Sequence, residues 1–241
     1  MGRKPSEPLI VDGKRKDGRS FEELRKIEVE LGVVTRANGS ALVKFGDTVA
    51  LAAVYGPAEL HPAHLREYQT GILRCRYSLA PFSVEERKVP GFDRRSVELS
   101  KVIRVAIEPA IFLEEFPKAV VDVFVEILQA DGSTRVTAIN ATNLALISAG
   151  IPMRDFVVAC SVGKIDNCLV VDLNGIEDNF SQADINFAFM PNRNKITLFQ
   201  GDGQLTKNEI KELISLAKKS CEKIYEVEKG VLSGKYSRQI S

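Results

Sequence analysis

The sequence has few of the side chains that bind zinc or form disulfide frameworks. Among its 241 residues there are two histidines, four cysteines and no tryptophan. The cysteines are scattered with no C-x-x-C pair, which argues against a zinc knuckle and against a disulfide framework. His61 and His64 have no cysteine nearby to complete a zinc site. The simple expectation is a protein of the reducing cytoplasm.

Long hydrophobic runs and an excess of either charge are also missing. No apolar run reaches the roughly 18 to 20 residues that a membrane span needs, so no membrane partner is expected. Lys and Arg (33) nearly balance Asp and Glu (32), which leaves a net charge of +1. Any contact with nucleic acid must therefore come from local clusters of charge or from partner subunits.

The apolar patterns along the chain predict strands interrupted by helices. Residues 1–24 are expected to form an extended, charged lead-in, with regular structure only after it. Alternating apolar side chains predict strands at 26–34, 41–45, 48–55, 73–79, 119–128, 156–162, 168–173, 185–190 and 196–200. Helical spacing predicts helices at 96–112 and 134–149 and a long C-terminal helix at 206–236.

Turn signals divide the second half of the chain. Gly163, residues 174–175 and residues 191–192 are predicted to be turns between strands. No linker rich in Gly, Ser or Pro separates the halves, which favours one domain over residues 1–241. Strand-rich halves that each carry helices indicate an α+β layered fold rather than a doubly wound parallel sheet.

The segment Gly132-Ser133-Thr134-Arg135 lies between a predicted strand and a predicted helix. Its backbone N–H groups should point outward at the positive end of that helix, where an anion is favoured. The Ser and Thr hydroxyls add donors, and Arg135 adds a guanidinium fork suited to phosphate. The alternative is an ordinary helix cap, because Ser and Thr cap many helices.

Two adjacent arginines, Arg94 and Arg95, lie at the start of the first predicted helix. The macrodipole disfavours cations at that end by roughly 0.3 to 1 kcal/mol unless an anion offsets them. The pair therefore predicts a bound phosphate. The alternative is a solvated loop in which Asp93 and Glu98 neutralise the two charges.

Two carboxylates, Asp178 and Asp184, flank one bend late in the chain. Oxygen ligands of this kind suit a hard cation such as Mg²⁺ or Mn²⁺, with water in the remaining positions. Such an ion would stabilise charge on the leaving oxygen of a phosphodiester. The alternative is that each Asp is an ordinary turn or cap residue.

Basic and aromatic side chains alternate between residues 61 and 104. This mixture suits single-stranded nucleic acid, because bases stack on rings while cations follow the backbone. The candidates for RNA contact in this region are His64, Arg66, Tyr68, Arg74, Arg76 and Arg94.

A set of short segments together resembles the RNase PH family, and most closely the catalytic RNase PH-like subunits of archaeal exosomes. The segments are residues 12–19, 55–57, 81–87, 93–95, 128–135, 149–153 and 177–184. The resemblance covers almost the entire chain. It implies an RNase PH-like fold of two related β-α units, of the ribosomal protein S5 domain 2-like type, with mixed sheets packed against helices.

The resemblance also implies an activity and its residues. In the family, inorganic phosphate attacks the terminal phosphodiester of single-stranded RNA and releases nucleoside diphosphates, and the reverse reaction adds a 3′ tail. By this similarity Arg95 and residues 132–135 would bind the attacking phosphate, and Arg94 would hold an RNA phosphate. Asp184 would be the central catalytic carboxylate and a ligand of Mg²⁺, with Asp178 as its partner.

The implied partners are other subunits and RNA. Family members form six-subunit rings, and the archaeal enzyme alternates this subunit with a related inactive one beneath a cap of RNA-binding subunits. This sequence departs from the family at two points. Gln182 stands where members often carry Glu, and Ala63 stands where archaeal relatives often have Arg.

Two other functions fit the same segments. One is a bacterial-type RNase PH, a homohexamer that trims tRNA 3′ ends. The other is a non-catalytic ring subunit that only binds RNA or builds the scaffold. Asp184 argues against the second, since inactive members of the family lose their carboxylate at that position.

Overall fold

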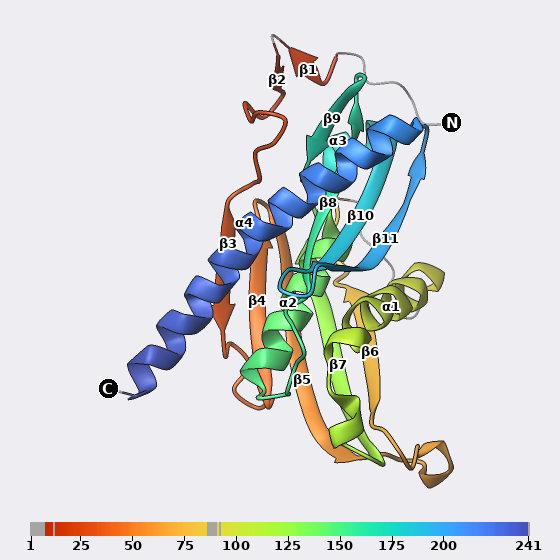
Figure 1. The fold of residues 1–241 in the computed structure, drawn as a ribbon, viewed down its shortest axis with the longest axis vertical. Coiled ribbons are helices and arrows are strands. Elements are labelled where there is room, and N and C mark those ends of the chain that lie inside the picture. Colours follow the sequence, from red (N-terminus) through yellow and green to blue (C-terminus); the bar gives the residue numbers. More distant parts are fainter. Residues whose placement is uncertain (1–7, 12, 86–90, 92, 241) are drawn as a thin grey trace.

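A computed structural model describes residues 8–11, 13–85, 91 and 93–240, and it contains two large sheets with a helix between them (Figure 1). The first sheet has the strand order β3-β4-β5-β7-β6. Its strands are β3 (Ile27–Leu31), β4 (Gly39–Phe45), β5 (Thr48–Glu59), β7 (Ala119–Gln129) and β6 (Ile72–Leu79). All neighbours are antiparallel except β6, which runs parallel to β7 at the edge of the sheet.

The second sheet is antiparallel and has the order β11-β10-β8-β9. Its strands are β8 (Val158–Ile165), β9 (Cys168–Val171), β10 (Ala183–Met190) and β11 (Lys195–Gly203). The helices are α1 (Arg94–Ile107), α2 (Thr134–Ser148), α3 (Gly175–Phe180) and α4 (Lys207–Ile240), and short 3₁₀ turns occur at Ala63–Leu65, Glu108–Ala110 and Leu113–Glu115.

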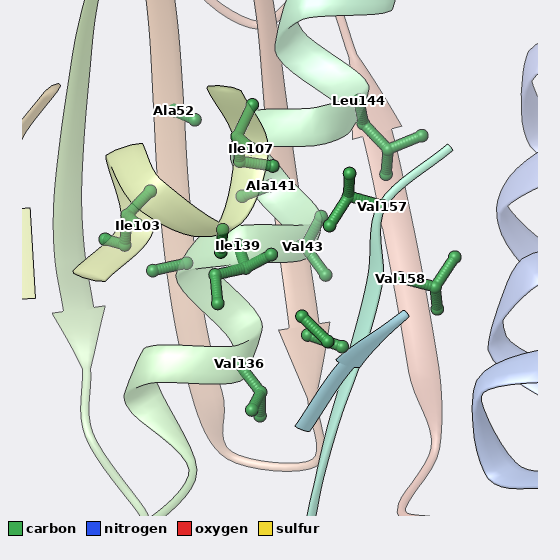
Figure 2. Close-up of a cluster of buried hydrophobic side chains, with 14 of the residues drawn as sticks. Val43, Ala52, Ile103, Ile107, Val136, Ile139, Ala141, Leu144, Val157 and Val158 are labelled. Atoms are coloured by element: carbon green, nitrogen blue, oxygen red, sulfur yellow. The ribbon is translucent and has the colours of Figure 1, made fainter. Parts of the chain in front are cut away.

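Helix α2 is the central element, because it packs against both sheets and against α1. Figure 2 shows its apolar side chains, among them Ile139 and Leu144, surrounded by side chains of both sheets and of α1. The buried amide of Asn140 also exchanges two hydrogen bonds of 2.8 Å with the backbone of Ala159 in β8. This pairing fixes α2 relative to the second sheet, and therefore fixes where the start of α2 lies.

The predicted α+β class, strands and long helices are confirmed, with ends that differ by a few residues. Both sheets contribute to one continuous buried cluster. The assignment of residues 1–241 to a single domain stays a prediction.

Two local predictions are wrong. Gly163 lies inside β8 rather than at a turn. A Cβ at that position would come within 2.3 Å of the Ala183 carbonyl oxygen, so the glycine allows β10 to approach closely. The turn comes instead at Asp166 and Asn167, which both have positive φ.

The lead-in is also more ordered than predicted. Residues Ile10–Val11 (β1) pair with Lys14–Arg15 (β2), and the side chain of Arg15 is almost fully buried. Residues 1–7 and Asp12 lie outside the described part of the chain. Helix α3, at residues predicted to form only a turn and a bend, was not expected from the sequence.

Candidate active site

A small pocket lies where the N-terminal ends of α1 and α2 meet α3 and β10. Its volume is about 30 Å³, enough for an ion or a water molecule. The residues that line it are Arg95, Leu99, Ser133, Thr134, Arg135, Asp178, Asp184 and Asn186. The structure thus brings together one member of the predicted double arginine, Arg95, with the predicted phosphate-binding turn and the predicted carboxylate pair.

Ser133 occupies the N-cap position of α2 but does not cap the helix with its side chain. Its hydroxyl instead donates to the carbonyl of Leu173 (2.7 Å) and bonds to the hydroxyl of Ser161 (2.6 Å). Its backbone is left-handed, with φ of 54°. The first N–H groups of α2 are therefore not used by this cap, as an anion site requires.

Position 132 requires a glycine because the predicted phosphate-binding turn and the segment before α3 approach each other closely there. Its φ is +70°, and a Cβ on it would lie 2.5 Å from the carbonyl carbon of Asn174. Any larger residue would push the phosphate-binding turn away from the start of α3. The glycine thus sets the spacing between the turn and Asp178.

Arg135 points a guanidinium toward the pocket without a complete set of partners. Its Nε is buried, and within the described part of the chain no acceptor receives its hydrogen bond. A buried donor of this kind costs about 1 to 3 kcal/mol unless a ligand accepts from it. An anion such as phosphate fits this requirement. Thr134, beside it, accepts a hydrogen bond of 3.2 Å from the buried hydroxyl of Tyr77 in β6.

Arg95 reaches the pocket from the first turn of α1. That helix is capped by Asp93, whose carboxylate accepts from the N–H of Ser96 at 2.6 Å. Asp93 is thus used as a cap, while Glu98 accepts from Gln200 of β11 at 3.4 Å. The alternative, that Asp93 and Glu98 neutralise the two arginines, stays a prediction.

Asp178 of α3 and Asp184 of β10 share a hydrogen bond at the floor of the pocket. Burial and the neighbouring carboxylate of Asp178 raise the pKa of Asp184 to about 6. Burial also raises the pKa of Asp178, against the opposing effect of Arg95. Asn186 donates to Asp184 at 3.2 Å. Two close, half-buried carboxylates therefore retain a proton more readily than usual.

The same two carboxylates have the donor chemistry of a Mg²⁺ site. Mg²⁺ usually takes one or two protein carboxylates, with water and substrate phosphate in the other positions. In residues 8–11, 13–85, 91 and 93–240, no group of three or more His, Cys, Asp or Glu side chains could hold a metal. The oxygen pair fits Mg²⁺ or Mn²⁺ better than it fits zinc.

The predicted RNA-contact residues fall in two places. Arg94 is exposed on α1 beside the pocket. The others lie on β6 and in the loop before it. This loop is at the end of β6 that is farthest from the first turn of α2 (Figure 1). The eight residues of β6 span roughly 25 Å. The loop residues are His64, Arg66 and Tyr68, and those on the strand are Arg74 and Arg76.

Several of these side chains already have protein partners. Arg66 donates to the carbonyl of Leu60 at 2.8 Å, and Arg74 makes a two-point pair with Asp122 at 2.6 and 2.7 Å. Tyr68 is 78% exposed, with the ammonium of Lys118 4.9 Å from its ring centre. Arg87, part of one family-like segment, lies outside the described residues.

Gln182 does not face the pocket. Its side chain exchanges hydrogen bonds with Asn167 in the turn between β8 and β9, at 2.8 and 3.2 Å. The replacement of a family Glu by Gln at this position therefore leaves the carboxylate pair untouched. Ala63 lies in the 3₁₀ turn Ala63–Leu65, far along β6 from the pocket.

Sequence patterns missed three residues of the site. Leu99 and Asn186 line the pocket, and Tyr77 binds Thr134. Leu99 has the spacing of a core residue, and Tyr77 has that of a strand, so neither carries a local functional signal. For Asn186, its position two residues after Asp184 on one strand places both on the same face, which is a usable signal.

Comparison with known families shows which family the chain belongs to. The model of the 3′ exoribonuclease family, domain 1, matches residues 23–152, and that of domain 2 matches residues 155–220. The chain belongs to the 3′ exoribonuclease (RNase PH) family. The pocket is formed by residues of both matched regions, with Arg95 and the turn from the first and the carboxylates from the second.

Relatives within this family are similar over nearly their whole length. The exosome complex component Rrp41 of Thermococcus gammatolerans is 56% identical over 98% of this chain and 95% of the relative. The proteins of the same description from Pyrococcus abyssi and Cenarchaeum symbiosum are 53% and 47% identical, again over 98% of this chain, and over 96% and 98% of their own lengths.

Solved structures of the RNase PH family share the fold. Rice (Oryza sativa) Rrp46 superposes with a TM-score of 0.81 at 22% identity, over 90% of this chain and all of that chain. A chain of the Archaeoglobus fulgidus exosome with RNA bound to the active site gives a TM-score of 0.79 at 26% identity, over 89% and 92%. Over the described residues, no helix is both long and apolar enough to cross a bilayer.

Proposed function

We infer that this chain is the phosphorolytic 3′→5′ exoribonuclease subunit of an archaeal exosome ring. The observation that carries this conclusion is the pocket itself. Anion donors at the start of α2, two arginines and two acidic side chains surround one space of ionic size. Phosphorolysis requires this combination, because inorganic phosphate must approach the phosphate of an RNA chain and the repulsion of two anions has to be offset.

Phosphate binds at the start of α2 in this proposal. The free N–H groups of the first turn, the Arg135 guanidinium and Arg95 hold it, with the Thr134 hydroxyl beside it. One phosphate oxygen attacks the phosphorus of the terminal phosphodiester, and the bond to the 3′ oxygen breaks. The terminal nucleotide leaves as a nucleoside diphosphate, and the reverse reaction extends the 3′ end.

The carboxylates act at the departing 3′ oxygen. Asp184 can hold the proton that this oxygen takes up, since its pKa is raised to about 6. Asp178 keeps Asp184 in place through their shared hydrogen bond. The pair would also hold Mg²⁺ or Mn²⁺, which when bound stabilises negative charge on the leaving oxygen.

Single-stranded RNA enters along β6 in this proposal. Arg94 holds an RNA phosphate beside the pocket, and the exposed arginines of β6 lead back to the loop that contains His64, Arg66 and Tyr68. The exposed ring of Tyr68 offers a stacking surface for a base. The existing pair of Arg74 with Asp122 holds that guanidinium on the outer face of the sheet.

The partners proposed are those of the archaeal relatives. The chain would alternate with a related inactive RNase PH-like subunit in a hexameric ring, beneath RNA-binding cap subunits, in the cytoplasm. Lysines and arginines together nearly balance the acidic residues, so neighbouring subunits would supply part of the field that guides RNA.

One experiment tests the activity and the assembly together. The chain is purified alone and with a candidate partner subunit, and each sample receives a 3′-labelled RNA with and without phosphate. We expect nucleoside diphosphates only with phosphate, and at a much higher rate in the mixed ring. Nucleoside monophosphates, or no product in any sample, would overturn the proposal.

The same experiment separates the other two functions. Full activity of the chain alone on tRNA 3′ ends would indicate a bacterial-type homohexamer. Binding of RNA without any product in the mixed ring would indicate a scaffold subunit.

A further inference from the structure

Behind the pocket lies a buried network of charges that joins the lead-in to both pocket segments. Three arginines take part, two in the lead-in and one directly after it, each no more than 9% exposed. The members of this arginine network are Arg15, Arg19 and Arg25 with Asp17, Asp131, Asp172 and Glu177.

Arg15 binds the first turn of α3. Its Nε donates to Glu177 at 2.7 Å, and its Nη2 donates to the other carboxylate oxygen. The same guanidinium donates to the carbonyls of Val171 (2.6 Å) and Asp172 (2.8 Å). Glu177 in turn accepts from the N–H of Asn174 at 3.0 Å, so it also caps the helix. Arg15 therefore fixes the helix at the residue directly before Asp178.

Arg25 binds the other pocket segment. It makes a two-point pair with Asp172 at 2.7 and 3.0 Å, and its Nη1 donates to the carbonyl of Asp131 at 2.6 Å. Asp131 directly precedes Gly132, whose own carbonyl accepts from Thr48 at 2.8 Å. Arg25 therefore holds the entry to the phosphate-binding turn.

The two segments fit against each other between these arginines. Asp131 accepts from the N–H of Gly175 at 3.0 Å, and a Cβ on Gly175 would lie 2.7 Å from the Asp131 carboxylate. A shift of either segment by one ångström would therefore open or close the distance between phosphate donors and carboxylates. Such shifts change catalytic rates strongly.

Stability alone is a poor explanation for so many buried charges. A buried ion pair loses most of its attraction to the cost of removing both ions from water, and apolar residues of similar size often serve as well. Apolar residues cannot fix the orientation of neighbouring polar groups. The fork of an arginine fixes the orientation of a carboxylate and of two carbonyls at once.

We propose that Arg15 and Arg25 are positioning residues with separate tasks. Arg15 sets the carboxylate side of the pocket through Glu177 and α3, and Arg25 sets the phosphate side through Asp131. This inference rests on the proposed phosphorolytic function, and neither arginine lines the pocket itself.

The test is to replace each arginine by lysine in the assembled ring, because lysine keeps the charge but loses the fork. For Arg15→Lys we expect kcat to fall at least tenfold, with KM for phosphate changed less than threefold. For Arg25→Lys we expect KM for phosphate to rise at least fivefold, with kcat changed less than threefold. Binding of Mn²⁺ to the chain, measured by electron paramagnetic resonance, should weaken at least fivefold for Arg15→Lys only.

Arg154→Lys is the matched control, since Arg154 pairs with Glu114 at the other end of α2 and far from the network. Thermal unfolding is measured for all variants. A general loss of structure would change both kinetic constants in both variants together, and that result would overturn the proposal. So would two folded variants with the kinetics and Mn²⁺ affinity of the unmodified ring.

A second variant tests the role of Arg15 in case Arg15→Lys does not fold. Glu177→Gln keeps an oxygen that can accept from Asn174 but removes the charge that Arg15 binds. It should reproduce the kcat and Mn²⁺ effects of Arg15→Lys, and normal values for both would overturn the role of Arg15. If the unmodified ring shows no phosphorolysis, the proposed function fails, whereas the Mn²⁺ comparison still tests the positioning by Arg15.

Discussion

Glu177 and Asp178 are neighbours in the chain, yet their carboxylates face opposite surroundings. Glu177 is 2% exposed and is bound by Arg15 and by a backbone N–H. Asp178 faces the pocket and shares its hydrogen bond with another acid, Asp184. The protein thus neutralises one carboxylate itself, whereas in the proposed function a ligand completes the other. By that proposal Glu177 helps to build the site and Asp178 takes part in its chemistry.

The largest expected effect comes from the pocket side. Asp184→Asn should reduce nucleoside diphosphate release by about 1000-fold, because it removes both an acid and an anionic ligand at the departing oxygen. The measurement is phosphorolysis of a single-stranded RNA by the ring.

Asp202→Asn is the control for this change. Asp202 is exposed on β11 directly opposite Asp184 in the ladder, so the same chemical change is made on the neighbouring strand. The control should keep its activity. Unchanged activity in Asp184→Asn would refute the assignment of the carboxylate.

The second largest effect is expected on the binding of phosphate in the pocket. Arg135→Gln should raise KM for phosphate by about 10- to 100-fold, since a charge-assisted hydrogen bond contributes about 1.5 to 3 kcal/mol. Phosphate titrations of the reaction rate measure it. Arg36→Gln, at an exposed arginine in the turn between β3 and β4, should leave KM unchanged. Equal KM in both variants would place the phosphate elsewhere.

A third carboxylate, that of Glu228, extends the comparison. It is fully buried on α4, and no described residue makes a hydrogen bond to either of its carboxylate oxygens. Burial raises its pKa well above the usual range. The folded protein therefore keeps a proton that the unfolded chain loses above its ordinary pKa, and stability falls as the pH rises through that interval.

Glu228→Gln should remove this loss of stability with rising pH, because an amide does not ionise. We expect its free energy of unfolding to exceed that of the unmodified chain by about 1 to 3 kcal/mol at pH 8, and the difference to shrink toward pH 5. Chemical denaturation at both pH values measures it. Glu226→Gln, on the exposed side of the same helix, is the control and should show no difference between the two pH values. A constant gain at both pH values would mean that ionisation of Glu228 is not the cause.

The sequence was most informative where a physical cause is local. Strand alternation and helical spacing depend on neighbouring residues, so the sheets and long helices could be predicted. Helix α3 has only six residues and begins at an Asn-Gly pair that resembles a turn, so periodicity could not reveal it. A glycine at position 163 resembles a turn signal. The structural reason for a glycine there is the close approach of the Ala183 carbonyl in β10, 20 residues later in the chain, which local patterns do not reveal.

The candidate site followed the same rule. The positions of Arg95 and of the Gly-Ser-Thr-Arg turn at helix N-termini could be predicted from local patterns, while their binding of an anion stays a prediction. The arginine network could not, since Arg15 and Glu177 are 162 residues apart and look like ordinary surface charges in a polar segment. Only the family-like segment 12–19 gave a sign that the lead-in matters, without saying what it contacts.

That long separation has a consequence for synthesis of the protein. At about 5 to 20 residues per second, a ribosome needs roughly 10 to 30 s after adding Arg15 before it adds Glu177. Throughout that interval Arg15 has no Glu177 to pair with. The nascent chain therefore cannot complete the arginine network until residue 177 of 241 has been added.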